Sequence, residues 1–278
     1  MLPIFSGISS ALSWGAADFF GGLASKSTSP YRVLFLAELA GLVPAVALAA
    51  IAGEPIPAAT DLILAAMASL LGLSGLVILY RALAAGQMSI AAPVSALLAA
   101  VSPVIFGLFS IGLPTTGTAL GFAVAFLSVW FISQADTSPT WRLSWGPLRG
   151  PLLAGLFFGL YFIMMHSATM DAFFWPLVSA RLAGCLAVGL MALRSREPVM
   201  PPRNLWGICL LTGALDMLGS ALYVLAAQTG RMDVAAVLGA MYPASTILLA
   251  WIVLKERITT VQSVGVLLAF AAILLFTI

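Results

Sequence analysis

Apolar stretches about 20 residues long recur along the whole chain, and this feature limits the possible folds more than any other. An α-helix of that length crosses about 30 Å of hydrocarbon. The runs are continuous and do not alternate with period two, which favours helices over a membrane β-barrel. The sequence predicts an all-α integral membrane protein with ten transmembrane helices, near 4–24, 33–52, 62–84, 88–111, 115–134, 150–170, 173–193, 204–228, 233–254 and 258–278.

Composition agrees with this class and argues against others. Hydrophobic residues make up 62% of the chain and charged residues 8%, and the mean hydropathy is +1.11. The first stretch has no basic leader, so we expect a retained helix and not a signal peptide. Cys185 and Cys209 lie in different predicted helices, and there is one histidine, so we expect no disulfide framework, no metal site and no cofactor. The net charge of +2 comes with no basic stripe, which argues against a nucleic-acid partner.

Basic residues orient the chain in the membrane. Each connection between helices takes the number of the helix that it follows. The even-numbered connections hold one basic residue, Arg231, and Arg181 lies inside a predicted helix. Because positive residues gather on the cytoplasmic side, odd connections are predicted to be cytoplasmic and both termini periplasmic, in a bacterial inner membrane. The odd connections hold Lys26, Arg32, Arg81, Arg142, Arg149, Arg194, Arg196, Arg203, Lys255 and Arg257.

The chain also repeats itself. The segment "GQMSIAA" at 86–92 answers "GRMDVAA" at 230–236, and "AELAG" at 37–41 answers "ARLAG" at 180–184. Each copy holds five helices, an odd number, so the second copy enters from the opposite face. We therefore predict two inverted five-helix repeats, 1–136 and 150–278, joined by a cytoplasmic linker at 137–149.

Two segments carry a family resemblance. "WGAADFFGGLASKS" at 14–27, and the run from Asp216 through "LYVLAAQTGRMDVAAVLGAMYPASTILLAWIVLKERIT" to Gly265, resemble the drug/metabolite transporter superfamily of EamA-domain type. The resemblance implies ten helices in two inverted repeats around a central cavity, and transport of small molecules, most often export. The acidic position that this family has before its last helix is Glu256 here, and Gly112 stands at the first-half equivalent.

Ionisable residues inside apolar stretches are the main site candidates, because each is costly in hydrocarbon unless it is paired or hydrated. Asp18 and His166 occupy corresponding helices. They form either a cation site or a proton relay, or else Asp18 only bonds neighbouring helix backbones and His166 lies at the membrane interface. Glu38 and Arg181 occupy equivalent repeat positions, so we expect an ion pair with a structural or gating role.

One face of the predicted eighth helix presents three polar groups in a row, Asp216, Ser220 and Tyr223, which should point inward because lipid offers them no partner. Aromatic residues in such a protein either pack between helices or line a cavity. In a cavity wall they suit an amphipathic solute. The cavity candidates of this kind are Trp14, Tyr80, Tyr161, Trp175 and Tyr242.

These observations predict a secondary active transporter, an exporter, for a small organic metabolite or amphipathic compound. No catalytic signature such as HExxH or GxSxG is present, so we expect no enzyme and no catalytic residues. Proton coupling follows from the titratable groups and from the absence of a nucleotide-binding motif. A facilitative channel and a lipid-linked head-group flippase are the alternatives. The predicted partners are the substrate and the lipid bilayer, and we expect a monomer.

Overall fold

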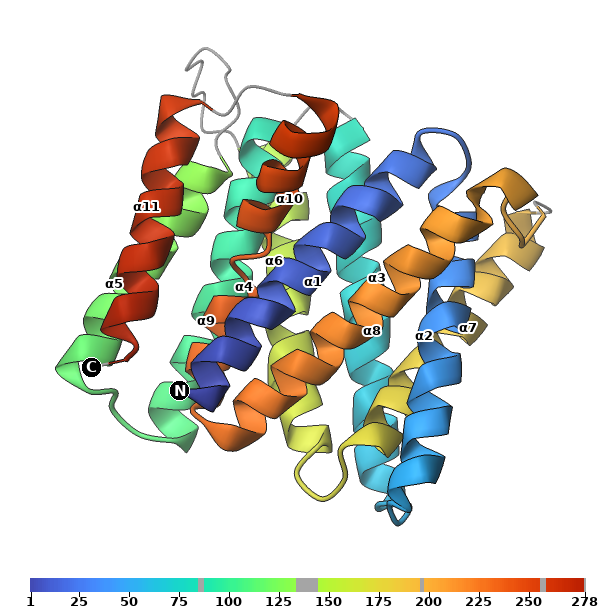
Figure 1. The fold of residues 1–278 in the computed structure, drawn as a ribbon, viewed down its shortest axis with the longest axis horizontal. Helices are drawn as coiled ribbons and strands as arrows, with labels where there is room; N and C mark the ends of the chain where they lie inside the picture. Colours follow the sequence, from blue (N-terminus) through green and yellow to red (C-terminus); the bar gives the residue numbers. More distant parts are fainter. Residues whose placement is uncertain (85–87, 134–144, 196–197, 256–258, 278) are drawn as a thin grey trace.

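The computed structural model describes residues 1–84, 88–133, 145–195, 198–255 and 259–277. Every element in these ranges is a helix (Figure 1). The helices are α1 Leu2–Ser25, α2 Pro30–Ala52, α3 Ala59–Ala84, α4 Met88–Ser110, α5 Thr116–Ile132, α6 Trp145–Ala168, α7 Phe174–Ser195, η1 Arg203–Leu205, α8 Trp206–Thr229, α9 Met232–Gly239, α10 Pro243–Leu249, η2 Ala250–Leu254 and α11 Thr260–Leu275.

Several of these helices can cross a membrane. Six helical segments of the described chain are long and apolar enough, namely Pro30–Ala52, Ala59–Ile78, Arg149–Ala168, Phe174–Ala192, Arg203–Thr229 and Met232–Leu254. Three shorter apolar helices accompany them, at Val94–Ser110, Thr116–Ile132 and Thr260–Leu275. The fold is therefore all-α, with the length and hydropathy of a multi-pass membrane protein.

Two predicted boundaries differ from the structure. The single helix expected over 233–254 is interrupted after Gly239, and Pro243 begins a new helix that ends in the π-helical segment η2. Proline has no N–H to donate to the preceding turn and its ring clashes with that turn, so the helix breaks there. Helix α6 begins at Trp145, inside the linker expected at 137–149, whose residues 137–144 lie outside the described ranges.

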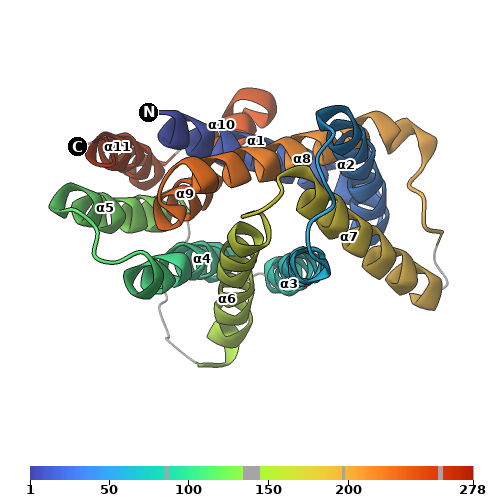
Figure 2. The ribbon, with the colours of Figure 1, turned by 90° about the horizontal axis from the view of Figure 1, so that it is seen from below.

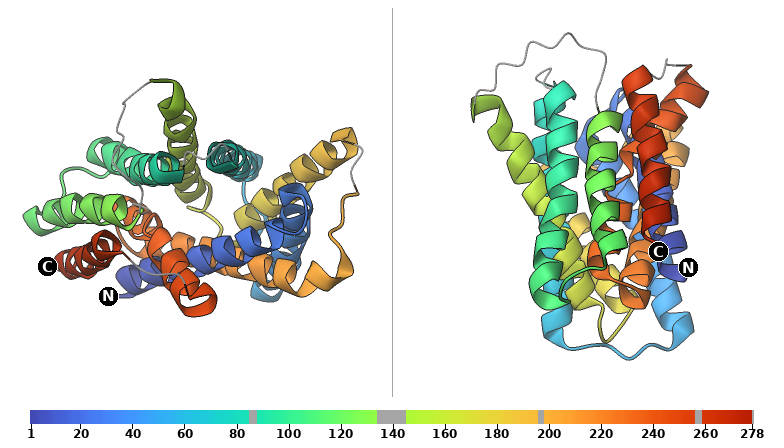
Figure 3. Two further views of the ribbon diagram at one scale, coloured as in Figure 1. Left: turned by 90° about the horizontal axis from the view of Figure 1, so that it is seen from above. Right: turned by 90° about the vertical axis from the view of Figure 1, so that its left-hand side faces the viewer.

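The most extensive packing joins helices from the two halves of the sequence. Helix α1 packs along α8, α3 along α6, α2 along α7, and α5 along α11. Helices α5 and α11 form one end of the molecule, and α2 and α7 lie toward the other end (Figures 1 and 2). The connections α2–α3, α4–α5, α6–α7 and α8–α9 lie on one face, and both termini lie nearer to it (Figure 1 and Figure 3, right).

Small residues let these helices approach closely. A Cβ atom added to Gly213 in α8 would lie 2.1 Å from the carbonyl oxygen of Ala37 in α2. The Ser10 hydroxyl in α1 donates to the Gly219 carbonyl at 2.7 Å, and the Ser128 hydroxyl in α5 donates to the Gly265 carbonyl at 2.8 Å. Close backbone approach and hydroxyl-to-carbonyl bonds are how helices associate when lipid removes the hydrophobic driving force between them.

Candidate functional site

A cavity of about 140 Å³ lies where the two halves meet. Helices α1, α2, α3, α4, α6, α7 and α8 line it, together with Tyr242 at the break before α10. Its surface is mainly apolar, from residues such as Leu73, Leu76 and Met165. The polar and aromatic side chains in its wall include Trp14, Asp18, Glu38, Tyr161, Arg181, Asp216 and Ser220.

Arg181 is the centre of a buried polar network in this wall. Its Nη1 atom lies 3.3 Å from Glu38 Oε2 and also contacts the Asp216 carboxylate directly, while Nη2 donates to Ser220 Oγ at 2.8 Å. Arg181 and Glu38 are each only 7% exposed. A buried charge is tolerated when it is paired and its hydrogen-bonding groups are satisfied, and two carboxylates do this for one guanidinium.

The structure thus brings Glu38 and Arg181 into contact, as their equivalent repeat positions suggested, and adds Asp216 as a third member. Asp216 lies near the middle of α8, between the ends at Trp206 and Thr229. The Ser220 hydroxyl, one turn later, donates to the Asp216 backbone carbonyl at 2.9 Å while it accepts from Arg181. The i, i+4 spacing on α8 therefore places two partners on the same side of the guanidinium.

Asp18 has a different environment. It lines the central cavity and also a second, smaller cavity toward Ser25 and Val33. The two cavities share Asp18, Glu38, Arg181 and Asp216, so the ionisable groups lie where the cavities adjoin. Within the described part of the chain, Asp18 makes no hydrogen bond and no ion pair.

Aromatic rings form one side of the cavity. Trp14, one helical turn before Asp18 in α1, has its ring centroid 6.3 Å from that of Tyr161 and 5.7 Å from that of Phe162. The Tyr161 hydroxyl donates to Ser220 Oγ at 3.4 Å, which joins the aromatic side to the Arg181 network. Behind this layer lies Tyr223, which is fully buried and donates its hydroxyl to the Phe162 carbonyl at 2.6 Å.

Some predicted cavity residues lie elsewhere. His166 is in the last turn of α6 and is not in the wall of either cavity, so the structure does not bring it together with Asp18. Tyr223 packs behind the wall, and Trp175 lies at the start of α7, away from the cavity. The backbone of Tyr80 belongs to α3, but its side chain lies outside the described residues.

Trp175 belongs instead to a contact that sequence reasoning missed, formed by Glu54 in the α2–α3 connection. The Glu54 carboxylate accepts hydrogen bonds from the backbone N–H groups of Phe173, Phe174 and Trp175 at 2.5, 2.8 and 3.1 Å. The Trp175 indole N–H donates to the Glu54 carbonyl at 2.9 Å. An anion at the N-terminus of α7 satisfies donors that have no partner within the helix. We call this contact the Glu54 latch.

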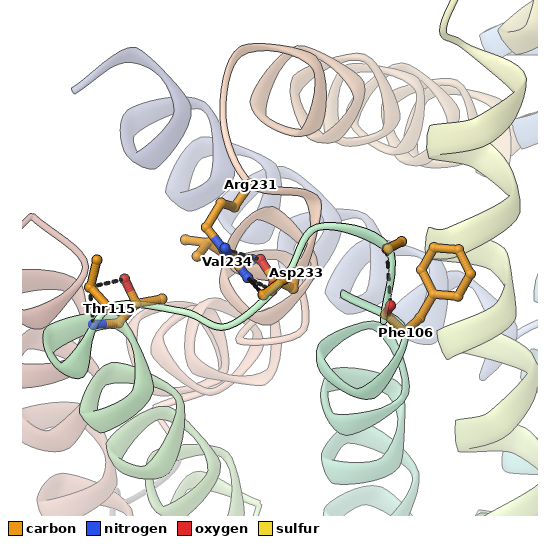
Figure 4. Close-up of polar contacts among 8 residues, drawn as sticks. Phe106, Thr115, Arg231, Asp233 and Val234 are labelled. Carbon is orange, nitrogen blue, oxygen red and sulfur yellow. Dashed lines mark hydrogen bonds and ion pairs between the residues drawn. The ribbon is translucent and has the colours of Figure 1, made fainter. Parts of the chain in front are cut away.

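A second polar contact lies on the same face, between the α4–α5 connection and the start of α9 (Figure 4). Arg231 pairs with Asp233 at 2.7 Å and donates to the Gly112 carbonyl at 3.1 Å. Asp233 is fully buried and also accepts from the Val234 N–H at 2.9 Å. The segment "GRMDVAA" had marked these residues as part of the repeat, but the contact joins residues 119 apart and no local pattern indicates it.

The described residues include no group of three or more His, Cys, Asp or Glu side chains arranged to hold a metal ion. The polar wall has three carboxylates that line both cavities, of which Glu38 and Asp216 are paired with Arg181 and Asp18 is not.

Comparison with known proteins agrees with this architecture. A solved structure, the crystal structure of a protein, superposes with a TM-score of 0.78 over 99% of this chain and 96% of that chain, at 15% sequence identity, which is a likeness of fold. No curated protein matches the sequence. Residues 147–278 match the EamA-like transporter family, and they include α7, α8 and the break before α10, which form much of the cavity wall. The second half of the chain is therefore similar to the EamA-like transporter family.

Proposed function

We propose that this protein is a secondary active transporter that exports a small organic solute across a bacterial inner membrane by alternating access. The observation that carries the proposal is the cavity between the halves, with Asp18 and the Arg181 network in its wall. Ionisable groups among membrane-spanning helices typically mark a substrate or ion pathway. The match of residues 147–278 to a transporter family supports this proposal.

The ten-helix, inverted-repeat organisation is part of the proposal. If α9, α10 and η2 are counted as one interrupted span and η1 as part of α8, the described residues of each half form five helices. The counterparts in the two halves are α1 and α6, α2 and α7, α3 and α8, α4 and α9, and α5 and α11. When every helix is replaced by its counterpart, each packed pair becomes another packed pair: α1·α8 becomes α6·α3, α2·α8 becomes α7·α3, and α1·α9 becomes α6·α4. The pairs α2·α7 and α5·α11 exchange with themselves. A pseudo-two-fold axis explains this pattern, and we propose 1–136 and 150–278 as the two repeats around it.

The same organisation suggests an orientation and a state. With odd connections in the cytoplasm, the face that carries the Glu54 latch and the Arg231 contact is periplasmic. Gln228 near the end of α8 also donates to the Thr169 carbonyl after α6. We infer that the structure represents a state closed toward the periplasm, and that export requires these contacts to open.

Proton coupling is the finer part of the proposal, with Asp18 as the coupling group. An ionised carboxylate without a partner is unfavourable in hydrocarbon, so a proton or a cation bound there is stabilised. Exchange of a proton for substrate at one shared site couples the two fluxes.

Transport is tested with purified protein in liposomes. A thermal-shift screen of a metabolite library first identifies a ligand, and counterflow of that ligand is then measured. A carrier accelerates uptake when substrate is present on the far side, whereas a channel does not, so the absence of acceleration contradicts the proposal. Collapse of an imposed pH gradient should stop accumulation, and unchanged accumulation would remove proton coupling.

A flippase for a lipid-linked head group is the alternative that one observation favours. A large crevice between α2, α3 and α7 is lined by apolar residues and by Tyr31 and Arg194, and it shares Leu73 with the central cavity. Such a lateral opening would admit an acyl chain. Movement of a fluorescent lipid-linked head group between leaflets of protein-containing liposomes distinguishes a flippase from a carrier of soluble solutes.

A further inference from the structure

The wall of the central cavity carries more negative than positive charge. Three carboxylates, Asp18, Glu38 and Asp216, share the wall with one guanidinium, that of Arg181. Among the described residues, no other Asp, Glu, Lys, Arg or His lines this cavity or the smaller one beside it. With all four groups ionised, the balance among these described lining residues is three negative charges against one positive. Cations are therefore attracted to this wall and anions are repelled.

The excess charge is concentrated at Asp18. Arg181 already contacts Glu38, Asp216 and Ser220, so two carboxylates balance its single positive charge. The helices packed on α1 bring no cation to Asp18. Their groups in the cavity wall are Glu38 from α2, Asp216 from α8 and Tyr242 before α10, and the Asp233 carboxylate of α9 is paired with Arg231.

The surroundings of Asp18 suit the body of an organic cation. Trp14 is one turn away on α1, and rings of Phe158, Tyr161 and Tyr242 line the same cavity. Aromatic faces attract ammonium groups, and they pack against apolar groups equally well. A metal cation prefers a shell of several oxygen ligands, and the described residues include no group of three or more His, Cys, Asp or Glu side chains placed to supply one. The volume of about 140 Å³ also exceeds what a single water molecule needs.

We propose that the cavity binds a small organic cation, an amine or quaternary ammonium with an aromatic or apolar body, and that Asp18 holds its charge. This substrate class rests on the transport function proposed above and narrows it. A proton and the organic cation cannot both neutralise the Asp18 carboxylate, so the two compete, and export of the cation is exchanged for entry of a proton.

Binding in detergent tests the substrate class without requiring transport. The probe is trimethyl(2-phenylethyl)ammonium, whose charge is fixed at all pH values, and calorimetry measures its affinity. The comparison ligands are 3-phenylpropan-1-ol, phenylpropionate and phenylalanine, which are neutral, anionic and zwitterionic. The wild-type protein should bind the ammonium probe at least tenfold more tightly than each of these, because the buried carboxylate attracts its fixed positive charge and the aromatic rings add cation–π contacts.

Variants assign the effect to one carboxylate. Asp18→Asn should lower the affinity for the ammonium probe at least tenfold. Asp18→Glu, which keeps the charge, should retain most of that affinity. Wild-type affinity should fall on acidification, because a proton on the Asp18 carboxylate removes the charge that holds the cation, and this dependence should disappear in Asp18→Asn. Asp171→Asn, an exposed acid in the α6–α7 connection, is the matched control and should bind like the wild type.

The outcomes separate the two proposals. If the alcohol, the anion or the zwitterion binds as tightly as the ammonium probe, or if folded Asp18→Asn binds it like the wild type, the substrate class is wrong. Transport of another solute in the counterflow assay would still stand. If the ammonium probe binds as expected but drives no counterflow, the cation site stands and the transport function fails.

Discussion

If the protein is the carrier proposed above, replacing Glu54 with alanine should favour opening of the side that carries the Glu54 latch. The Glu54 carboxylate is the acceptor for three consecutive backbone N–H groups at the start of α7, at 2.5, 2.8 and 3.1 Å. Alanine removes all three acceptor contacts, whereas glutamine keeps one side-chain oxygen and loses the charge. Since Glu54 lies in the α2–α3 connection, the latch holds that connection to the start of α7.

The size of the effect follows from these bonds. Loss of an N-terminal cap destabilises a helix by about 0.5–2 kcal/mol, and loss of the anion at the helix dipole adds about 0.3–1 kcal/mol. Glu54 is half-buried, so water replaces part of the interaction, and we take about 2 kcal/mol as the total for alanine. If the latch is absent from the other state, this shifts the balance between the states by roughly 30-fold. Glutamine should give an intermediate shift.

A cysteine placed in the cavity wall reports the opening. In a background with Cys185 and Cys209 replaced by alanine, Ala180→Cys puts a thiol in α7 at a cavity position that is only 6% exposed. Its labelling by a membrane-impermeant maleimide from the periplasmic side should be at least tenfold faster with Glu54→Ala, within the roughly 30-fold shift expected from the lost interaction energy.

Asp171→Ala is the control, because this exposed carboxylate lies in the α6–α7 connection beside the latch and takes no part in it. It should label at the rate of the parent. If Glu54→Ala labels within twofold of the parent although its melting temperature falls, the contact is a helix cap and has no part in gating.

Three further changes test the packing and the polar network. Arg181→Gln leaves the cavity carboxylates without their cation, so thermal unfolding in detergent should show a loss of about 3–5 kcal/mol, and an unchanged melting temperature would show that the cluster is already solvated. Gly213→Ala should lower the free energy of unfolding by about 1–3 kcal/mol, since the new Cβ would lie 2.1 Å from the Ala37 carbonyl oxygen. Gly207→Ala in the same helix is the control, because its Cβ meets nothing within 4 Å, and it should be neutral or slightly stabilising. Equal melting temperatures of the two variants would contradict the close packing at Gly213. Tyr223→Phe removes one buried hydrogen bond and should lose about 0.5–1.5 kcal/mol in the same assay, with substrate affinity unchanged because the residue lies behind the cavity wall.

A charge swap between Glu38 and Arg181 tests their pairing only when Asp216 is changed as well. Exchanging Glu38 and Arg181 would place a glutamate against Asp216, which contacts the same guanidinium. A failed rescue would then reflect repulsion between two carboxylates and would say nothing about pairing. Adding Asp216→Asn to the swap removes that repulsion and restores an interpretable test.

Much of this protein is determined by its sequence. In hydrocarbon the backbone must satisfy its own hydrogen bonds, so each apolar run of sufficient length becomes a helix, and most predicted helix ends lie within a few residues of the observed ones. Charged residues in such runs stand out for the same reason, which is why Asp18, Glu38, Arg181 and Asp216 were identified from the sequence before their contacts were known.

Tertiary structure decided which of these groups meet. The helices are apolar on nearly all sides, so no polar stripe in the sequence fixes the rotation of each helix about its axis. Packing of small residues such as Gly213 sets that rotation, and it turns Asp216 toward Arg181, leaves Asp18 unpaired and keeps His166 out of the cavity. The Glu54 latch joins residues about 120 positions apart, and only the folded chain brings them together.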